Sequence, residues 1–143
     1  ILNPINADGI VPVVKKANEA GIPVITLDRG SNGGEVTSFL ETDNVAMGQE
    51  AAKYIAQELT KRYGEAKGNV VDLQGLRGTT AAESREKGFM DEIGKYPGIK
   101  VVVSQAADFN QEKALNIMQN ALQAHPDIDA VFGANDDNAM GAV

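Results

Sequence analysis

The sequence predicts an α/β protein whose parallel sheets are covered by helices. Short apolar runs rich in β-branched residues recur along the chain, and the segments between them have apolar residues at helical spacing. Strands that alternate with helices form βαβ units, in which the strands are parallel and helices cover both faces of the sheet. We therefore expect a three-layer αβα arrangement.

The beginning of the chain contains one helix and two strands. Apolar residues from Ile10 to Ala17 have helical spacing, and Gly21 fits the position that follows a helix. The strands are predicted at residues 23–27 and 36–42. Only a loop rich in Gly, Asn and Ser separates them, so the alternation of strand and helix breaks here. We place a crossing into a second lobe near Asp43.

The rest of the chain alternates regularly. Asp43 or Asn44 can cap a long helix that ends at Gly64, and the Thr80-x-x-Glu83 pattern is a capping box that opens a second helix. Strands are predicted at residues 69–73, 99–104 and 130–134. A helix that begins near Gln111 is expected to turn inward Ala114, Leu115, Met118, Ala121 and Leu122.

The two ends of the sequence indicate how much of a fold is present. The first four residues, ILNP, are typical of a strand that runs into a loop. The last residues, from Asp136 on, are typical of a helix that has just begun. We interpret the chain as an incomplete two-lobe fragment of a longer protein.

Composition excludes several classes of function. Lys and Arg number 13 against 20 Asp and Glu, a net charge of −7, whereas nucleic acids and anionic membranes attract clustered basic residues. The chain has no Cys, and His125 is its one histidine, which leaves little for thiolate chemistry, histidine catalysis or a metal site. We expect no enzyme activity, no cofactor, no metal and no nucleic-acid partner.

Polar side chains follow the predicted strands at their carboxyl ends, where open parallel sheets bind their ligands. Carboxylate and amide oxygens accept hydrogen bonds from hydroxyls, guanidinium groups donate to hydroxyl and ring oxygens, and an aromatic ring can cover the apolar face of a sugar. This set suits a small polyhydroxylated ligand. The candidate binding residues are Asp28, Arg29, Arg85, Phe109 and Asn135.

Each of these residue types also has a purely structural explanation. Asp and Asn at strand ends often cap helices or form turns, and Asp108 and Asp136 are the expected caps because each stands at a helix start. Arg85 could lie on a helix surface and Phe109 in the core. The case for a site depends on the convergence of these residues on one sheet edge.

Four segments carry a family resemblance. Residues 1–29, 43–56, 73–89 and 104–143, in this order, closely resemble the sugar-binding members of the type 1 periplasmic binding proteins. In that family two αβα lobes are joined by a hinge and close over a monosaccharide. The resemblance implies a periplasmic-binding-protein-like type 1 fold and extends over essentially the whole chain.

The resemblance also implies an organisation and a role for each candidate residue. Residues 1–43 would form the C-terminal part of the N-terminal lobe, and residues 44–143 the first part of the C-terminal lobe. Asp28 and Arg29 resemble the pair that bonds sugar hydroxyls from the N-terminal lobe. In the C-terminal lobe, Arg85 resembles the arginine that reaches the sugar, Phe109 the stacking aromatic residue, and Asn135 the amide contact.

The expected function is that of a solute receptor. The ligand would be a monosaccharide, with D-ribose favoured over allose or other pentoses, and the partner the membrane permease of an ABC importer, with a chemotaxis receptor as a further partner. The location would be the periplasm, or the cell exterior as a membrane-anchored lipoprotein in a Gram-positive bacterium. The main alternative is the sugar-effector domain of a lactose-repressor-type transcription regulator. An enzyme of a doubly wound fold is a third, although no nucleophile, base or cofactor loop is apparent.

Overall fold

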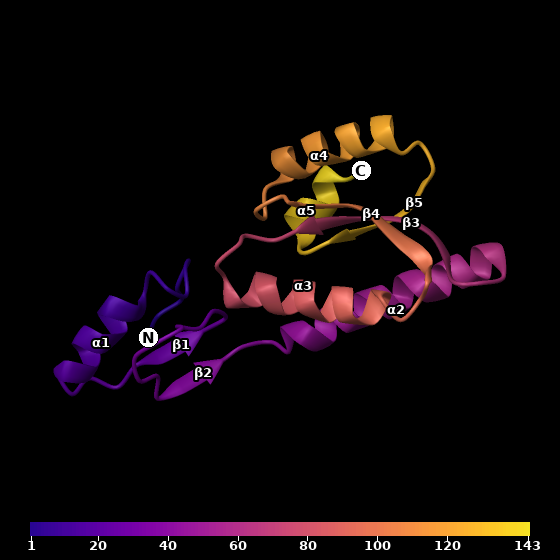
Figure 1. Ribbon diagram of the computed structural model, residues 1–143. Helices are drawn as coiled ribbons and strands as arrows, with labels where there is room; N and C mark the ends of the chain where they lie inside the picture. The colour runs from indigo at the N-terminus through magenta and orange to yellow at the C-terminus, as the bar shows by residue number, and fades with distance from the viewer.

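The computed structural model describes residues 1–143, which form two separate parallel sheets (Figure 1). The elements in chain order are α1 (Val11–Glu19), β1 (Ile25–Leu27), β2 (Ser38–Leu40), α2 (Asn44–Tyr63), β3 (Lys67–Gln74), α3 (Thr80–Ile93), β4 (Gly98–Ala106), α4 (Gln111–Ala124), β5 (Ile128–Gly133) and α5 (Asp136–Gly141). We call residues 1–40 the smaller unit and residues 44–143 the larger unit; residues 41–43 connect them.

The larger unit has the predicted three layers. Its strand order is β4-β3-β5, with both pairings parallel, and α2 and α3 lie on one side of the sheet while α4 and α5 lie on the other (Figure 1). Neighbouring residues of the central strand serve opposite faces: Val70 packs in the core under α2 and α3, whereas Val71 and Leu73 pack in the core under α4. The α/β fold class with parallel sheets is confirmed.

Two glycines bring α2 and α3 into backbone contact. A Cβ on Gly48 would lie 2.1 Å from the carbonyl oxygen of Arg85, and a Cβ on Gly88 would lie 2.1 Å from that of Val45. No side chain fits at either position, so only glycine permits this crossing. The contact fixes α3, and with it Arg85, against the beginning of α2.

The ends of α2 follow the sequence prediction. The Asp43 side chain accepts a hydrogen bond from the Ala46 backbone N–H at 2.9 Å, which satisfies one of the unpaired donors of the first turn. The helix ends at Gly64, whose φ of 78° is left-handed and therefore suits glycine. Asp43, and not Asn44, is the cap.

The predicted capping box of α3 does not form, because the helix cap lies one residue earlier, at Thr79. Thr79 caps the helix, because its hydroxyl accepts from the Ala82 N–H at 3.3 Å, and Glu83 accepts from the Gly78 N–H at 3.1 Å. The hydroxyl of Thr80 instead accepts from the backbone N–H of Gly30, at 3.0 Å. The Thr80 hydroxyl, which the sequence pattern assigned to the helix cap, thus bonds to the smaller unit instead.

The expected caps of α4 and α5 were also wrong. The α4 cap is Asn110, which accepts from the Lys113 N–H at 2.9 Å, and the α5 cap is Asn135. Asp108 cannot serve, because it lies before Asn110 with a left-handed φ of 56° and pairs with the Lys113 ammonium. Asp136 already lies within the first turn of α5, where its charge suits the helix dipole.

The inward face of α4 is narrower than predicted. Ala114, Met118 and Ala121 are buried, at the i, i+4, i+7 spacing of a single stripe. Leu115 and Leu122 remain 40% and 50% exposed, so their predicted inward position is wrong. They lie about 100° further round the helix than that stripe. Sequence spacing alone does not say which edge of an apolar face meets the sheet.

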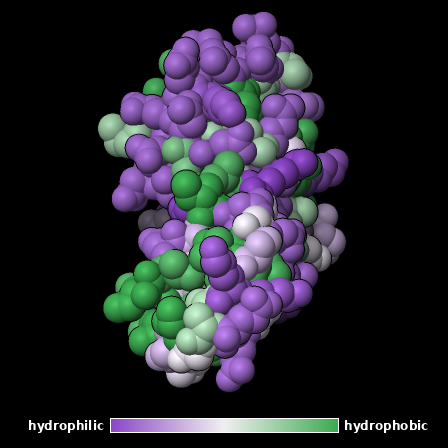
Figure 2. All heavy atoms as spheres, turned by 90° about the vertical axis from the view of Figure 1, so that its left-hand side faces the viewer, coloured by the Kyte–Doolittle hydropathy of each residue, from purple (hydrophilic) through white to green (hydrophobic).

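The smaller unit covers only one face of its sheet. Val14 of α1 and Thr26 of β1 are fully buried, but Leu27 and Leu40, which are paired in the parallel register and lie on the opposite face from Thr26, are 38% and 57% exposed. Figure 2 shows hydrophobic residues gathered at the lower left of the molecule, below a mostly hydrophilic upper part. Outside the sheet, Val13 and Ile22 are also more than half exposed.

Hydrogen bonds from backbone N–H groups join the two units around the start of α3. The N–H of Ala7 donates to the carbonyl of Gly78 at 3.0 Å, and Gly30 donates to Thr80 as described above.

None of the helices combines the length and the apolar character that spanning a bilayer would require.

Candidate functional site

Three residues at strand ends have a backbone conformation that non-glycine residues rarely adopt. Asp28 follows β1, and Asp108 and Phe109 follow β4; their φ angles are 63°, 56° and 57°. Aspartate tolerates this region better than phenylalanine does. Such strained residues cluster at binding sites and persist where the surrounding structure holds them. Two of the three, Asp28 and Phe109, are predicted sugar contacts.

The ring of Phe109 occupies space that is free only because residue 75 is a glycine. A Cβ on Gly75 would lie 2.4 Å from two ring carbons of Phe109 and 2.9 Å from the Cβ of Ala82. The half-buried ring therefore lies against the residue that follows β3, beside the first turn of α3. Sequence reasoning missed Gly75, although a glycine directly after a buried strand is a signal for close approach.

Arg85 is fixed by two hydrogen bonds. Its Nε donates to the side-chain oxygen of Asn44 at 2.8 Å, and its Nη1 donates to the carbonyl of Ala134 at 2.7 Å. A guanidinium has five N–H groups, so donors remain for a ligand, including those of Nη2. Arg85 and Asn135 line one pocket of about 420 Å³, between α2 and the end of β5.

Asn135 has a structural task that limits what it can offer. Its amide oxygen accepts from the Asn138 N–H at 3.0 Å as the cap of α5, and its Nδ2 lies 3.3 Å from the Asp137 carboxylate. One lone pair of the oxygen and one of the two N–H groups are thus already used. The second lone pair and the second N–H are what it can present to a ligand.

Asp28 and Arg29 form the part of the candidate site that belongs to the smaller unit. The Arg29 Nε lies 3.6 Å from the Asp28 carboxylate, too far for a good hydrogen bond, and this nitrogen is buried without any other partner. Leaving a buried charged donor unpaired costs more than an ordinary hydrogen bond contributes. A ligand hydroxyl would remove that penalty.

The structure brings the five predicted residues to one region in three groups. Arg85 and Asn135 share a pocket, Phe109 lies beside the first turn of α3, and Asp28 with Arg29 precedes Gly30, which bonds to that same turn. Asp28 and Arg29 make no hydrogen bond or ion pair to the other three. The beginning of α3 is therefore where the groups meet, and a ligand would have to bridge the two units.

The family of the chain follows from a comparison of its sequence with known families. Residues 1–143 match the family described as "Periplasmic binding protein domain". The chain belongs to the periplasmic binding proteins.

No group of three or more His, Cys, Asp and Glu side chains in the chain is arranged to hold a metal ion.

Relatives of this periplasmic binding protein are named for sugars. The ribose import binding protein RbsB of Escherichia coli (strain K12) is 47% identical over 143 residues, which cover the whole chain but 46% of the relative. The D-allose-binding periplasmic protein of the same strain is 36% identical over 145 residues, covering 96% of this chain and 45% of that protein. The chain thus spans about half the length of these curated relatives.

A solved structure gives the same picture. A carbohydrate transporter solute binding protein from Agrobacterium radiobacter, in complex with D-arabinose, superposes with a TM-score of 0.89 at 34% identity. The superposition covers 97% of this chain and 47% of the other. The named relatives are binding and transport proteins, which supports a role other than catalysis for this periplasmic binding protein.

A buried carboxylate near the site was not predicted. Asp72 of β3 is fully buried, and the Ser104 hydroxyl donates to its Oδ2 at 2.7 Å. Burial raises the pKa of Asp72 to about 7, and the neighbouring Glu86 carboxylate adds to this rise. One oxygen of each, Asp72 Oδ1 and Glu86 Oε2, is buried without a hydrogen-bond partner. The only sequence signal was a charged residue inside the apolar run NVVDL.

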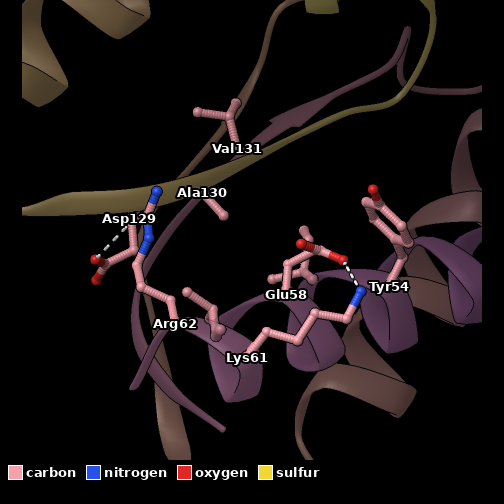
Figure 3. Close-up of a pocket in the computed structure, with 9 residues that line it drawn as sticks. Tyr54, Glu58, Lys61, Arg62, Asp129, Ala130 and Val131 are labelled. Atoms are coloured by element: carbon pink, nitrogen blue, oxygen red, sulfur yellow. Dashed lines mark hydrogen bonds and ion pairs between the residues drawn. The ribbon is translucent and has the colours of Figure 1, made fainter. Parts of the chain in front are cut away.

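Another pocket of this periplasmic binding protein lies away from the candidate site. It has a volume of about 510 Å³ between α2 and the edge strand β5, and Figure 3 shows Asp129 near Arg62 at one end and the Lys61–Glu58 pair at the other. The Tyr63 hydroxyl donates to Asp129 and lowers the pKa of that carboxyl. None of the five predicted sugar contacts lines this pocket, and we therefore do not assign the sugar to it.

Proposed function

We propose that this periplasmic binding protein captures a monosaccharide between its two units, and that D-ribose is that sugar. The observation that carries the proposal is the placement of two arginines, one in each unit, with N–H groups that have no hydrogen-bond partner in the protein. Arg29 contributes its buried Nε from the smaller unit, and Arg85 contributes Nη2 from the larger one. A sugar presents hydroxyl and ring oxygens that both can reach only if it lies between them.

We further propose that residues 1–43 and residues 44–143 belong to two lobes, with the crossing at residues 41–43. The separate sheets support this division. A sugar bonded from both lobes would gain its full set of contacts only in the closed arrangement. It would therefore shift the population towards the closed form.

The proposed partner is the membrane permease of an ABC importer, which would receive the closed, loaded form. The name of the ribose import relative, at 47% identity, supports both the sugar and the importer over a transcription regulator. We propose the periplasm, or the outer face of a Gram-positive membrane through a lipid anchor, as the location, and a chemotaxis receptor as a second partner. Catalysis and nucleic-acid binding are not part of the proposal.

Calorimetric titration of the intact protein tests the sugar directly. D-ribose is expected to bind one to one with a dissociation constant of about 1 µM or lower, because four or five charge-assisted hydrogen bonds support such an affinity. D-glucose and D-galactose serve as comparisons, and D-allose as the nearest competitor. Binding of another sugar without ribose would overturn the ribose proposal, and no binding of any sugar would overturn the receptor function.

A further inference from the structure

Asn44 joins a proposed ligand group to the connection between the two units. Its side-chain oxygen accepts from the Arg85 Nε at 2.8 Å. Its Nδ2 donates in the other direction, to the carbonyl of Thr42 at 3.0 Å and to the carboxylate of Glu41 at 3.3 Å. The residue is only 2% exposed. One buried amide therefore contacts both α3 and the connecting residues 41–43.

Helix capping does not explain this arrangement. Asp43 already caps α2, so the side chain of Asn44 is not needed for that task. An amide carries an acceptor and donors on adjacent atoms, and both kinds are used here by different elements. An apolar residue of similar size would bury equally well but would leave the Arg85 Nε without an acceptor.

The two helices that carry Asn44 and Arg85 are fixed against each other. Gly48 and Gly88 hold α2 and α3 in backbone contact, and Arg85 lies one turn before Gly88. Because neither helix can shift without a clash, the position of Asn44 sets the direction of the Arg85 guanidinium. The Thr42 and Glu41 side of the amide belongs to the connection, which crosses between the sheets.

We propose that Asn44 is a positioning residue for sugar binding: it aims the Arg85 guanidinium at the ligand and ties that group to the connection between the units. This inference rests on the proposed function, in which Arg85 contacts the sugar. It assigns Asn44 an effect through Arg85 and no contact of its own with the ligand.

A double-mutant cycle on the intact protein, read by calorimetric titration of D-ribose, tests the inference. We expect Asn44→Ala to weaken affinity about tenfold and Arg85→Ala to weaken it about thirtyfold or more. The double variant should be within about threefold of Arg85→Ala alone, because Asn44 acts only through that side chain. Fully additive losses would overturn the inference and leave the proposed function intact. No loss in Arg85→Ala would instead remove Arg85 from the site, and with it this inference.

Two further variants separate positioning from folding. Asn44→Asp keeps an acceptor for the Arg85 Nε, so it should recover affinity to within about threefold of the unmodified protein, even if the protein is less stable. A loss equal to that of Asn44→Ala would contradict the inference. Asn69→Ala is the matched control, because its amide joins β3 to Asp127 near the amino end of the strand. It should lower stability without changing ribose affinity.

Discussion

The larger and the smaller unit show how one βα pattern gives two degrees of burial. In the larger unit helices cover both faces of the sheet, and Val70 and Val71, neighbours in β3, are both fully buried. In the smaller unit one helix covers one face, and Leu40 of β2 is 57% exposed. At about 25 cal/mol per Å² of buried apolar surface, the larger unit has the greater stabilisation of its own. Burial in the larger unit therefore also shifts the pKa of a polar group more strongly than burial in the smaller unit does.

The largest expected effect is the pH dependence caused by Asp72 in the larger unit. Its folded-state pKa of about 7 exceeds the ordinary value of 3.8, so the folded protein keeps a proton that the unfolded chain loses above about pH 4. This contribution to stability is complete below about pH 4 and is lost as the pH rises to 7, a decline of up to about 4 kcal/mol.

Denaturant titrations of the intact protein at about pH 5 and about pH 8 measure the larger part of that decline, about 2–3 kcal/mol. Asp72→Asn should largely remove it, because the amide does not ionise. Glu35→Gln, which changes an exposed residue of the smaller unit, is the control and should alter stability by less than about 0.5 kcal/mol at either pH. Identical pH profiles for the unmodified protein and Asp72→Asn would contradict the account.

The glycine contacts sharpen the comparison between the units. Gly88→Ala would place a methyl group 2.1 Å from the Val45 carbonyl oxygen, so we expect the free energy of unfolding to fall by about 3 kcal/mol or more. Gly21→Ala in the smaller unit meets no atom within 4 Å and adds only the strain of a left-handed φ, about 1 kcal/mol. Equal losses in the free energy of unfolding would show that α2 and α3 are less tightly packed than described.

Arg85→Ala tests the ligand side of the larger unit. The substitution should weaken sugar binding by about 2–4 kcal/mol, because it removes a charged donor and leaves buried acceptors unpaired. Isothermal titration of the intact variant measures this loss. A fall in affinity of less than about threefold would exclude Arg85 from the site.

The smallest effect is expected in the exposed sheet of the smaller unit. Leu40→Ala should change the free energy of unfolding of residues 1–143 by less than about 0.5 kcal/mol, since the side chain already contacts solvent. Val71→Ala in the larger unit is the counterpart and should cost about 2 kcal/mol. A cost for Leu40→Ala as large as that for Val71→Ala would mean that this face is covered in solution.

Periodicity predicted the fold class, while the binding role that strand-end chemistry assigns to the five candidate residues stays a prediction. Local signals succeeded where the partner lies nearby in sequence, as with Asp43 and Gly64 at the ends of α2. They failed at Thr80, where a distant group decides, because Thr80 bonds to Gly30, fifty residues away. They also failed at Asp108, whose left-handed backbone leaves the capping role to Asn110.

Buried polar contacts were the least predictable part. Nothing around Asn44 in the sequence indicates that Arg85, forty-one residues later, would bond to it. Asp72 belongs to a strand that periodicity identified, yet its raised pKa comes from burial and from Glu86 on α3. Such interactions depend on how two helices and a sheet pack together, which residue spacing along one element does not encode.

A crystal structure of the intact protein with D-ribose would test the central claim most directly. The account predicts that the sugar lies between the two units, within hydrogen-bonding distance of Asp28 and Arg29 on one side and of Arg85 and the Asn135 amide N–H groups on the other. The ring of Phe109 should cover its apolar face. Ribose bound to residues of one unit alone, or in the pocket between α2 and β5, would contradict the account.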